Sequence, residues 1–158
     1  MSEDYIRILR ESLEKKASVL KKITILNERQ RHYFERSDTM PDELEANIEA
    51  KGALVDQIVA LDDGFEQVYA RVQEVLSERR EDYKDEIRAM QDLIREVTEL
   101  SSKVEAQEQR NRDLAAKFYG EKKAQTRQVR KGTAAVNRYY QGTMRAGAIN
   151  PQFMDTKQ

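Results

Sequence analysis

The sequence predicts an all-α protein, an elongated antiparallel bundle of three long helices followed by a weakly packed C-terminal helical segment. Apolar residues recur three, four and seven positions apart along most of the first 120 residues, which is the spacing of helices that bury one face. Four of the six glycines follow residue 119. Charged residues make up 36% of the 158-residue chain, against about 25% in ordinary domains, so the core is expected to be thin.

The first helix is expected over residues 3–36. Its charged residues, such as Arg7 and Lys15, fall on the opposite face from an apolar stripe and should face water. Asp38 or Thr39 is expected to cap the next helix, with Pro41 at its first position. The stripe consists of Ile6, Leu9, Leu13, Leu20, Ile23 and Leu26, with Tyr33 and Phe34 at its end.

The second helix is expected over residues 41–78, where a seven-residue repeat predicts a seam that packs along another helix. The repeat crosses Asp62-Asp63-Gly64, which by itself resembles a turn. Because the register is kept across this tripeptide, we expect a continuous helix, and the turn is the alternative. The seam consists of Leu54, Ile58, Leu61, Phe65, Val68, Val72 and Val75.

The third helix is expected over residues 82–118. The apolar register slips by one position after Val75, within the charged run 78–82, and this slip predicts a tight turn near 77–82. Seam positions of the third helix become polar at Gln107 and Asn111, where looser packing is expected. Short connections between segments of similar length predict an up-down-up bundle. The third apolar pattern consists of Tyr83, Ile87, Met90, Ile94, Val97, Val104, Leu114 and Phe118.

Composition and motifs exclude most enzyme classes. The chain has no cysteine and one histidine, which rules out disulfides, cysteine nucleophiles and Cys/His zinc sites. It also lacks the phosphate-loop, G-x-S-x-G and H-E-x-x-H motifs. His32 is interpreted as a surface or capping residue, and no catalytic residue, cofactor or metal is predicted. Solvated helix faces are expected to explain the acidic residues Glu43, Glu45, Glu49, Asp62 and Asp63.

The chain shows no targeting or membrane-spanning pattern. No apolar run approaches the ~18 residues that a membrane span requires. The N-terminal residues Met1-Ser2-Glu3-Asp4 are acidic and do not resemble a signal peptide. These observations predict a soluble, cytoplasmic protein that does not insert into a membrane.

Residues 1–120 are expected to form the bundle domain, and residues 121–158 a mobile, basic and amphipathic segment. Residues 117–145 contain eight basic residues and one acidic residue. A solvated helix end, a partner-binding segment and a nucleic-acid-binding segment all fit this charge. The pI of about 6.0 argues against nucleic acid. Several apolar residues favour a partner-binding segment that becomes ordered on binding: Val129, Val136, Tyr139, Tyr140, Met144, Ile149, Phe153 and Met154.

Four stretches of the chain form a recognisable pattern: Lys51-Gly52-Ala53-Leu54-Val55-Asp56-Gln57-Ile58, Leu61-Asp62-Asp63-Gly64-Phe65-Glu66, Ala135-Val136-Asn137-Arg138-Tyr139-Tyr140 and Pro151-Gln152-Phe153-Met154-Asp155-Thr156-Lys157. This pattern resembles the FlgN-type flagellar export chaperones, particularly those of Gram-positive bacteria. The resemblance implies a small cytoplasmic all-α chaperone of flagellar type III secretion. Such chaperones keep hook–filament junction proteins soluble and deliver them to the export gate. The matching cargo-binding positions are Val136, Tyr139, Tyr140, Met144 and Phe153.

Two other functions stay open at this point. The chain could be a coiled-coil scaffold that self-associates through the seam from Leu54 to Val75, or an accessory protein that binds nucleic acid through its basic tail. A chaperone should form a discrete heterocomplex through residues 121–158. A scaffold should form homo-oligomers through residues 41–78, and a nucleic-acid binder should lose affinity steeply with salt.

Overall fold

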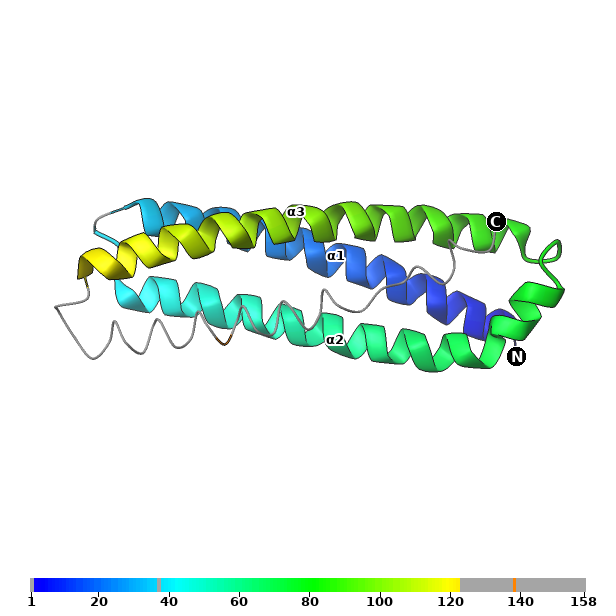
Figure 1. Ribbon diagram of the computed structural model, residues 1–158. Helices are drawn as coiled ribbons and strands as arrows, with labels where there is room; N and C mark the ends of the chain where they lie inside the picture. Colours follow the sequence, from blue (N-terminus) through cyan, green and yellow to red (C-terminus); the bar gives the residue numbers. More distant parts are fainter. Residues whose placement is uncertain (1, 37, 123–137, 139–158) are drawn as a thin grey trace.

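The computed structural model describes residues 2–36, 38–122 and 138, and three long helices account for most of this part of the chain. They are α1 (Ser2–Glu35), α2 (Pro41–Glu78) and α3 (Lys84–Lys122). The helices lie side by side along their length, and α2 runs opposite to both α1 and α3 (Figure 1). The prediction of an all-α, up-down-up bundle is therefore confirmed.

Helix α1 is the central element of the bundle. It packs along both α2 and α3, whereas α2 and α3 barely approach each other. Figure 1 shows α1 passing between the other two helices. Both α2 and α3 therefore lie close to α1, and they meet each other mainly through their side chains.

Hydrogen bonds fix the link between α1 and α2 at the end of α1 and at the start of α2. The buried Thr39 hydroxyl donates to the carbonyl of Tyr33 and so satisfies the end of α1. Met40 is the N-cap residue of α2, because a residue before proline is restricted to extended backbone, and its ψ is 141°. Its N–H donates to the Glu43 carboxylate at 3.4 Å. The expectation that Asp38 or Thr39 caps α2 was therefore wrong.

Helix α2 continues without interruption through residues 61–64, as the unbroken heptad register predicted. Gly64 is exposed, and no heavy atom lies within 4 Å of the position that a Cβ would occupy. An interior glycine costs a helix only about 1 kcal/mol relative to alanine, so it does not interrupt a helix that packs along its whole length.

The turn between α2 and α3 lies close to the predicted position and spans Arg79 to Tyr83. The Arg79 N–H donates to the carbonyl of Val75, and the Asp82 N–H donates to the carbonyl of Arg79. The Arg79 guanidinium also binds the Asp82 carboxylate at 3.0 Å. Tyr83 points back into the core, and its side chain is buried. Side-chain contacts and a buried aromatic ring therefore fix a turn that contains neither glycine nor proline.

The apolar core consists of two clusters that follow each other along the bundle. One lies at the end where the α2–α3 turn is, and the other at the end where α1 leads into α2. The first contains Ile6, Leu9, Leu13, Phe65, Tyr69, Val72, Leu76, Tyr83, Ile87, Met90 and Ile94. The second contains Ala17, Val19, Leu20, Ile23, Phe34, Leu44, Ile48, Val55, Ile58, Val97, Val104, Ala115 and Phe118.

The predicted seam of α2 is only half correct. Ile58, Phe65 and Val72 are buried as expected, but the other four members of the seam are half-buried and lie at its flank. On the buried face of α2, these three residues alternate with other residues, two of which, Lys51 and Asp62, are charged. Because the prediction used apolar residues alone, it placed the centre of the buried face too far to one side. The buried positions are Lys51, Val55, Ile58, Asp62, Phe65, Tyr69, Val72 and Leu76.

Replacing Ile58 by aspartate should destabilise the bundle by more than ~3 kcal/mol, because the side chain is 3% exposed and an unpaired charge would enter the core. Urea unfolding followed by circular dichroism measures the change. Gly64→Ala is the matched control on the same helix, and it should raise the stability by about 0.5–1 kcal/mol. An Ile58→Asp protein as stable as the parent would show that this face of α2 is exposed.

Candidate functional site

The five predicted binding residues, Val136, Tyr139, Tyr140, Met144 and Phe153, lie outside the residues that the structure describes. Of the segment 123–158, the structure describes Arg138, which is exposed. The structure therefore brings none of the five together, and their role stays a prediction. It does describe the surface and the interior of the bundle to which this segment is attached.

Helix α3 ends beside an aromatic cluster. The ring centroids of Phe34 and Phe118 are 5.6 Å apart, and Tyr119 lies edge-on to both, at 6.2 Å from Phe34 and 5.2 Å from Phe118. Burial raises the pKa of Tyr119 to about 12, and the negative charge of Glu45 on α2 adds to the rise. The end of α3 is thus anchored to α1 and lies near the start of α2.

The side chain of Lys51 is completely buried where the three helices meet. Its Nζ donates to Oε1 of Gln30 on α1 at 2.9 Å and forms an ion pair with Oε1 of Glu108 on α3, also at 2.9 Å. Within residues 2–36 and 38–122, this is the one ion pair that joins α2 to α3. Burial lowers the pKa of Lys51 from 10.5 to about 8, although the Glu108 carboxylate acts in the opposite direction.

Buried amide side chains extend this polar group between α1 and α3. The Asn111 amide donates to the carbonyl of Asn27 at 2.9 Å and to Oε1 of Gln30 at 3.0 Å. The Asn27 amide donates to Oε1 of Gln107 at 3.1 Å. We call these six residues, Asn27, Gln30, Lys51, Gln107, Glu108 and Asn111, the polar cluster. Looser packing at Gln107 and Asn111 was expected, and this was wrong because their partners keep both side chains buried.

The polar cluster reaches the surface at Glu28 and Arg110. Oε1 of Glu28 accepts hydrogen bonds from Arg110 at 3.1 Å and from Gln107 at 3.2 Å. Desolvation acts to raise the pKa of Glu28, but the hydrogen bond and charge of Arg110, together with the charge of Arg31, hold it below its ordinary value. The interior hydrogen bonds therefore end in the partly exposed charges of Glu28 and Arg110, although Nη2 of Arg110 is buried without a hydrogen-bond partner.

A second buried ion pair lies between the two apolar clusters. Nζ of Lys16 on α1 binds Oδ1 of Asp62 on α2 at 2.8 Å, and both side chains are at most 8% exposed. Burial raises the pKa of Asp62, and the hydrogen bond and charge of Lys16 offset only part of this rise. Asp62 was expected on a solvated face, and this was wrong, whereas its neighbour Asp63 is exposed.

A sequence signal for these polar residues was present in the heptad registers. In α1, Asn27 falls in the register Ile6, Leu13, Leu20, Asn27, Phe34, and Gln30 falls in the register Leu9, Lys16, Ile23, Gln30. The seven-residue spacing therefore continues through polar residues as well as apolar ones. The predicted stripe included apolar residues only, so it contained Leu26 in place of its buried neighbour Asn27.

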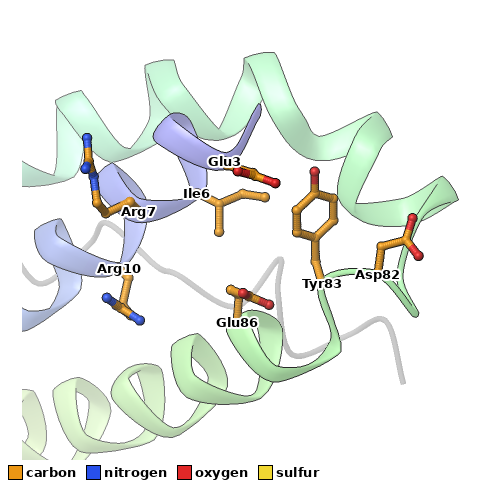
Figure 2. Close-up of a pocket in the computed structure, with 7 residues that line it drawn as sticks. All are labelled: Glu3, Ile6, Arg7, Arg10, Asp82, Tyr83 and Glu86. Atoms are coloured by element: carbon orange, nitrogen blue, oxygen red, sulfur yellow. The ribbon is translucent and has the colours of Figure 1, made fainter. Parts of the chain in front are cut away.

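A surface hollow of about 410 Å³ lies where the start of α1 meets the α2–α3 turn (Figure 2). Tyr83 and Ile6 face each other across it, and charged side chains surround them. Its arginines are already engaged in ion pairs along α1, Arg7 with Asp4 and Arg10 with Glu14. The hollow therefore holds exposed charges of both signs and no buried acid–base pair. Its lining residues are Glu3, Ile6, Arg7, Arg10, Asp82, Tyr83 and Glu86.

His32 is exposed near the end of α1. Across residues 2–36 and 38–122, no three or more His, Cys, Asp or Glu side chains are grouped so that they could bind a metal ion. None of α1, α2 and α3 combines the length and the apolar character that a membrane-spanning helix requires. The charged groups that stand out are the buried ones described above.

Replacing Lys51 by methionine should destabilise the bundle by about 3–5 kcal/mol, because Glu108 loses a buried ion-pair partner. The double variant Lys51→Met/Glu108→Leu should recover most of this loss, since an apolar pair of similar volume needs no compensation. Chemical unfolding of the parent and both variants tests this. A double variant as unstable as the single one would show that the two side chains do not act as a pair.

The contribution of Lys51 to stability should depend on pH. Its pKa is about 8 in the folded state, and about 10.4 is expected for an unfolded lysine, so between these values the unfolded state binds the additional proton. The free energy of unfolding of the parent, relative to Lys51→Met/Glu108→Leu, should therefore rise with pH from about 8 to 10, by at most about 1.4 kcal/mol per pH unit. The double variant is the reference because Lys51→Met by itself leaves Glu108 buried without its ion-pair partner. A difference that stays flat across this range would contradict the buried, charged lysine.

Comparison with known proteins leaves the family of this chain open. No family model, curated protein or solved structure matches it. The resemblance to FlgN-type chaperones consequently stays a prediction that depends on the four stretches quoted above and on the five residues assigned from them. The site that the structure itself describes is the buried polar cluster of a helical bundle, and the basic segment 123–158 follows this bundle in sequence.

Proposed function

We propose that this protein is a non-enzymatic flagellar export chaperone of the FlgN type. It binds secreted hook–filament junction subunits in the cytoplasm and delivers them to an export-gate component. One observation carries the proposal: the backbones of α2 and α3 both lie close to α1 but hardly approach each other, so these two helices meet mainly through side chains such as Lys51 and Glu108. A bundle of this kind supports the addition of a further amphipathic helix.

The composition of residues 121–158 supports a role in partner binding. Val136, Tyr140 and Met144 recur four residues apart and would lie on one side of a helix. Methionine and tyrosine suit a surface that adapts to partners, because methionine is flexible and tyrosine combines a large apolar ring with a polar end. A cargo helix would meet this apolar side, with Tyr139 and Phe153 adding to it.

The burial of α2 weighs against the self-associating scaffold. Ile58, Phe65 and Val72, which would form the seam of a homomeric coiled coil, are already buried within one chain. Self-association through them would require the bundle to open. The nucleic-acid alternative also loses support, because the basic residues of the tail belong to a chain whose formal net charge is −1.

Replacing Tyr140 and Met144 by aspartate in the full chain should abolish capture of a flagellar subunit from the source cell lysate, with helicity and melting unchanged. Affinity capture followed by mass spectrometry measures this, and a 1–120 truncation should behave in the same way. The matched control replaces Ile8 and Ile25, which are 41% and 56% exposed on α1, by aspartate and should retain the subunit.

Three results would contradict the chaperone proposal. Capture of the protein by itself in a homo-oligomer would favour the scaffold. Capture of material that nuclease removes would favour a nucleic-acid binder. A sharp fall in melting temperature of the Tyr140→Asp/Met144→Asp variant would place these residues in the core, and the assignment of the segment would then be wrong.

A further inference from the structure

Helix α2 has an unusual excess of negative charge. It contains ten acidic and two basic residues, a formal charge of −8, whereas α1 contains six acidic and eight basic residues and α3 contains nine and eight. Asp62 is the one buried acid among the ten, and the other nine are exposed. The excess therefore lies on the surface of a single helix.

This charge is not compensated within the bundle. On α1 and α3, exposed acids pair with basic residues of the same helix, for example Glu14 with Arg10 and Asp92 with Arg95. None of the exposed acids of α2 forms an ion pair with another described residue. The two basic residues of α2 are engaged elsewhere, since Lys51 is buried in the polar cluster and Arg71 contacts the Tyr5 ring and hydroxyl on α1.

Part of this charge faces the side between α2 and α3. Glu45 and Asp63 are 18 residues apart, which is five turns of a helix, and Glu66 lies one turn further on. These three exposed acids therefore form a stripe. The charge of Glu45 acts on Tyr119 of α3, so the start of the stripe lies on the side of α2 that is nearer α3. On this side the backbones of α2 and α3 hardly approach each other.

The chain contains a segment of opposite charge that starts at the correct end. Residues 123–158 hold seven basic residues and one acidic residue, a formal charge of +6. They follow Lys122, where α3 ends near the start of α2. As a helix these 36 residues would span about 54 Å, against about 57 Å for the 38 residues of α2.

We propose that the acidic side of α2 that faces α3 is a docking surface for the chain's own basic segment 123–158. Opposite charges favour the contact, since the segment carries a formal charge of +6 and α2 one of −8. The direct connection to α3 gives the segment an effective concentration on the order of millimolar. A second copy of the chain lacks this advantage, and nucleic acid would be repelled by α2. The docking requires no cargo and is independent of the chaperone proposal.

Paramagnetic labelling of the full chain tests the docking directly. Because the sequence has no cysteine, Ala70→Cys places a single nitroxide on an exposed position of α2, and Ser18→Cys places one on an exposed position of α1. A run of consecutive amide signals within residues 123–158 of the ¹⁵N-labelled protein should be broadened by the label at 70 and retained with the label at 18. About 1 M salt, where the Debye length is ~3 Å, should restore the lost signals.

A charge variant and its matched control identify the surface. Glu45→Gln/Asp63→Asn/Glu66→Gln should restore the signals of 123–158. Removing three charges from α1, in Glu11→Gln/Glu14→Gln/Glu35→Gln, should leave them broadened. Equal broadening from both label positions, or none from either, would overturn the proposal. A further control mixes ¹⁴N chains that carry the nitroxide with ¹⁵N chains that contain no cysteine. Broadening in this mixture would also overturn the proposal, because the segment would then dock on a second copy of the chain. Bundle amide shifts that match the parent show that each variant is folded.

Discussion

The charged amine of Lys51 sets the arrangement of the bundle more than any apolar contact does. An ammonium group with no exposed surface is tolerated only where acceptors reach it from the surrounding helices, and here they come from Gln30 on α1 and Glu108 on α3. Apolar side chains can slide along one another by a turn with modest loss. The amine, the carboxylate and the amides of the polar cluster cannot, since a shift leaves each of them buried without a partner.

The Lys16–Asp62 pair repeats this constraint near the middle of the molecule. It joins α1 to α2, whereas the polar cluster joins all three helices, so together they fix α2 against α1 at two separated points. The apolar clusters between and beyond these points supply most of the favourable burial. Polar pairs therefore define the register, and apolar packing stabilises it.

Spacing in the sequence was sufficient to predict the helices but not their buried faces. The bounds of α2, its continuity through Gly64 and the position of the turn after Glu78 all follow from periodicity and from one slip in register. The polar cluster was missed because apolar residues alone defined the seam, and Lys51, Asp62 and Asn111 occupy seam positions whose partners are distant in sequence. Which polar residues can be buried depends on such partners, and no local pattern specifies them. The predicted binding residues lie in the part of the chain that the structure does not describe.

The central position of α1 has a consequence for the order of synthesis. The helix that contacts both others is made first, so it emerges from the ribosome before either of its partners exists. Pairing with α2 can follow as soon as that helix is complete, because the two are joined by a short link. The side of α1 that awaits α3 includes Asn27 and the half-buried Glu28, both of which water can solvate before α3 is made. A nascent α1–α2 hairpin therefore presents a partly polar stripe to the surrounding water until α3 is made, which reduces the apolar surface available to other newly made chains.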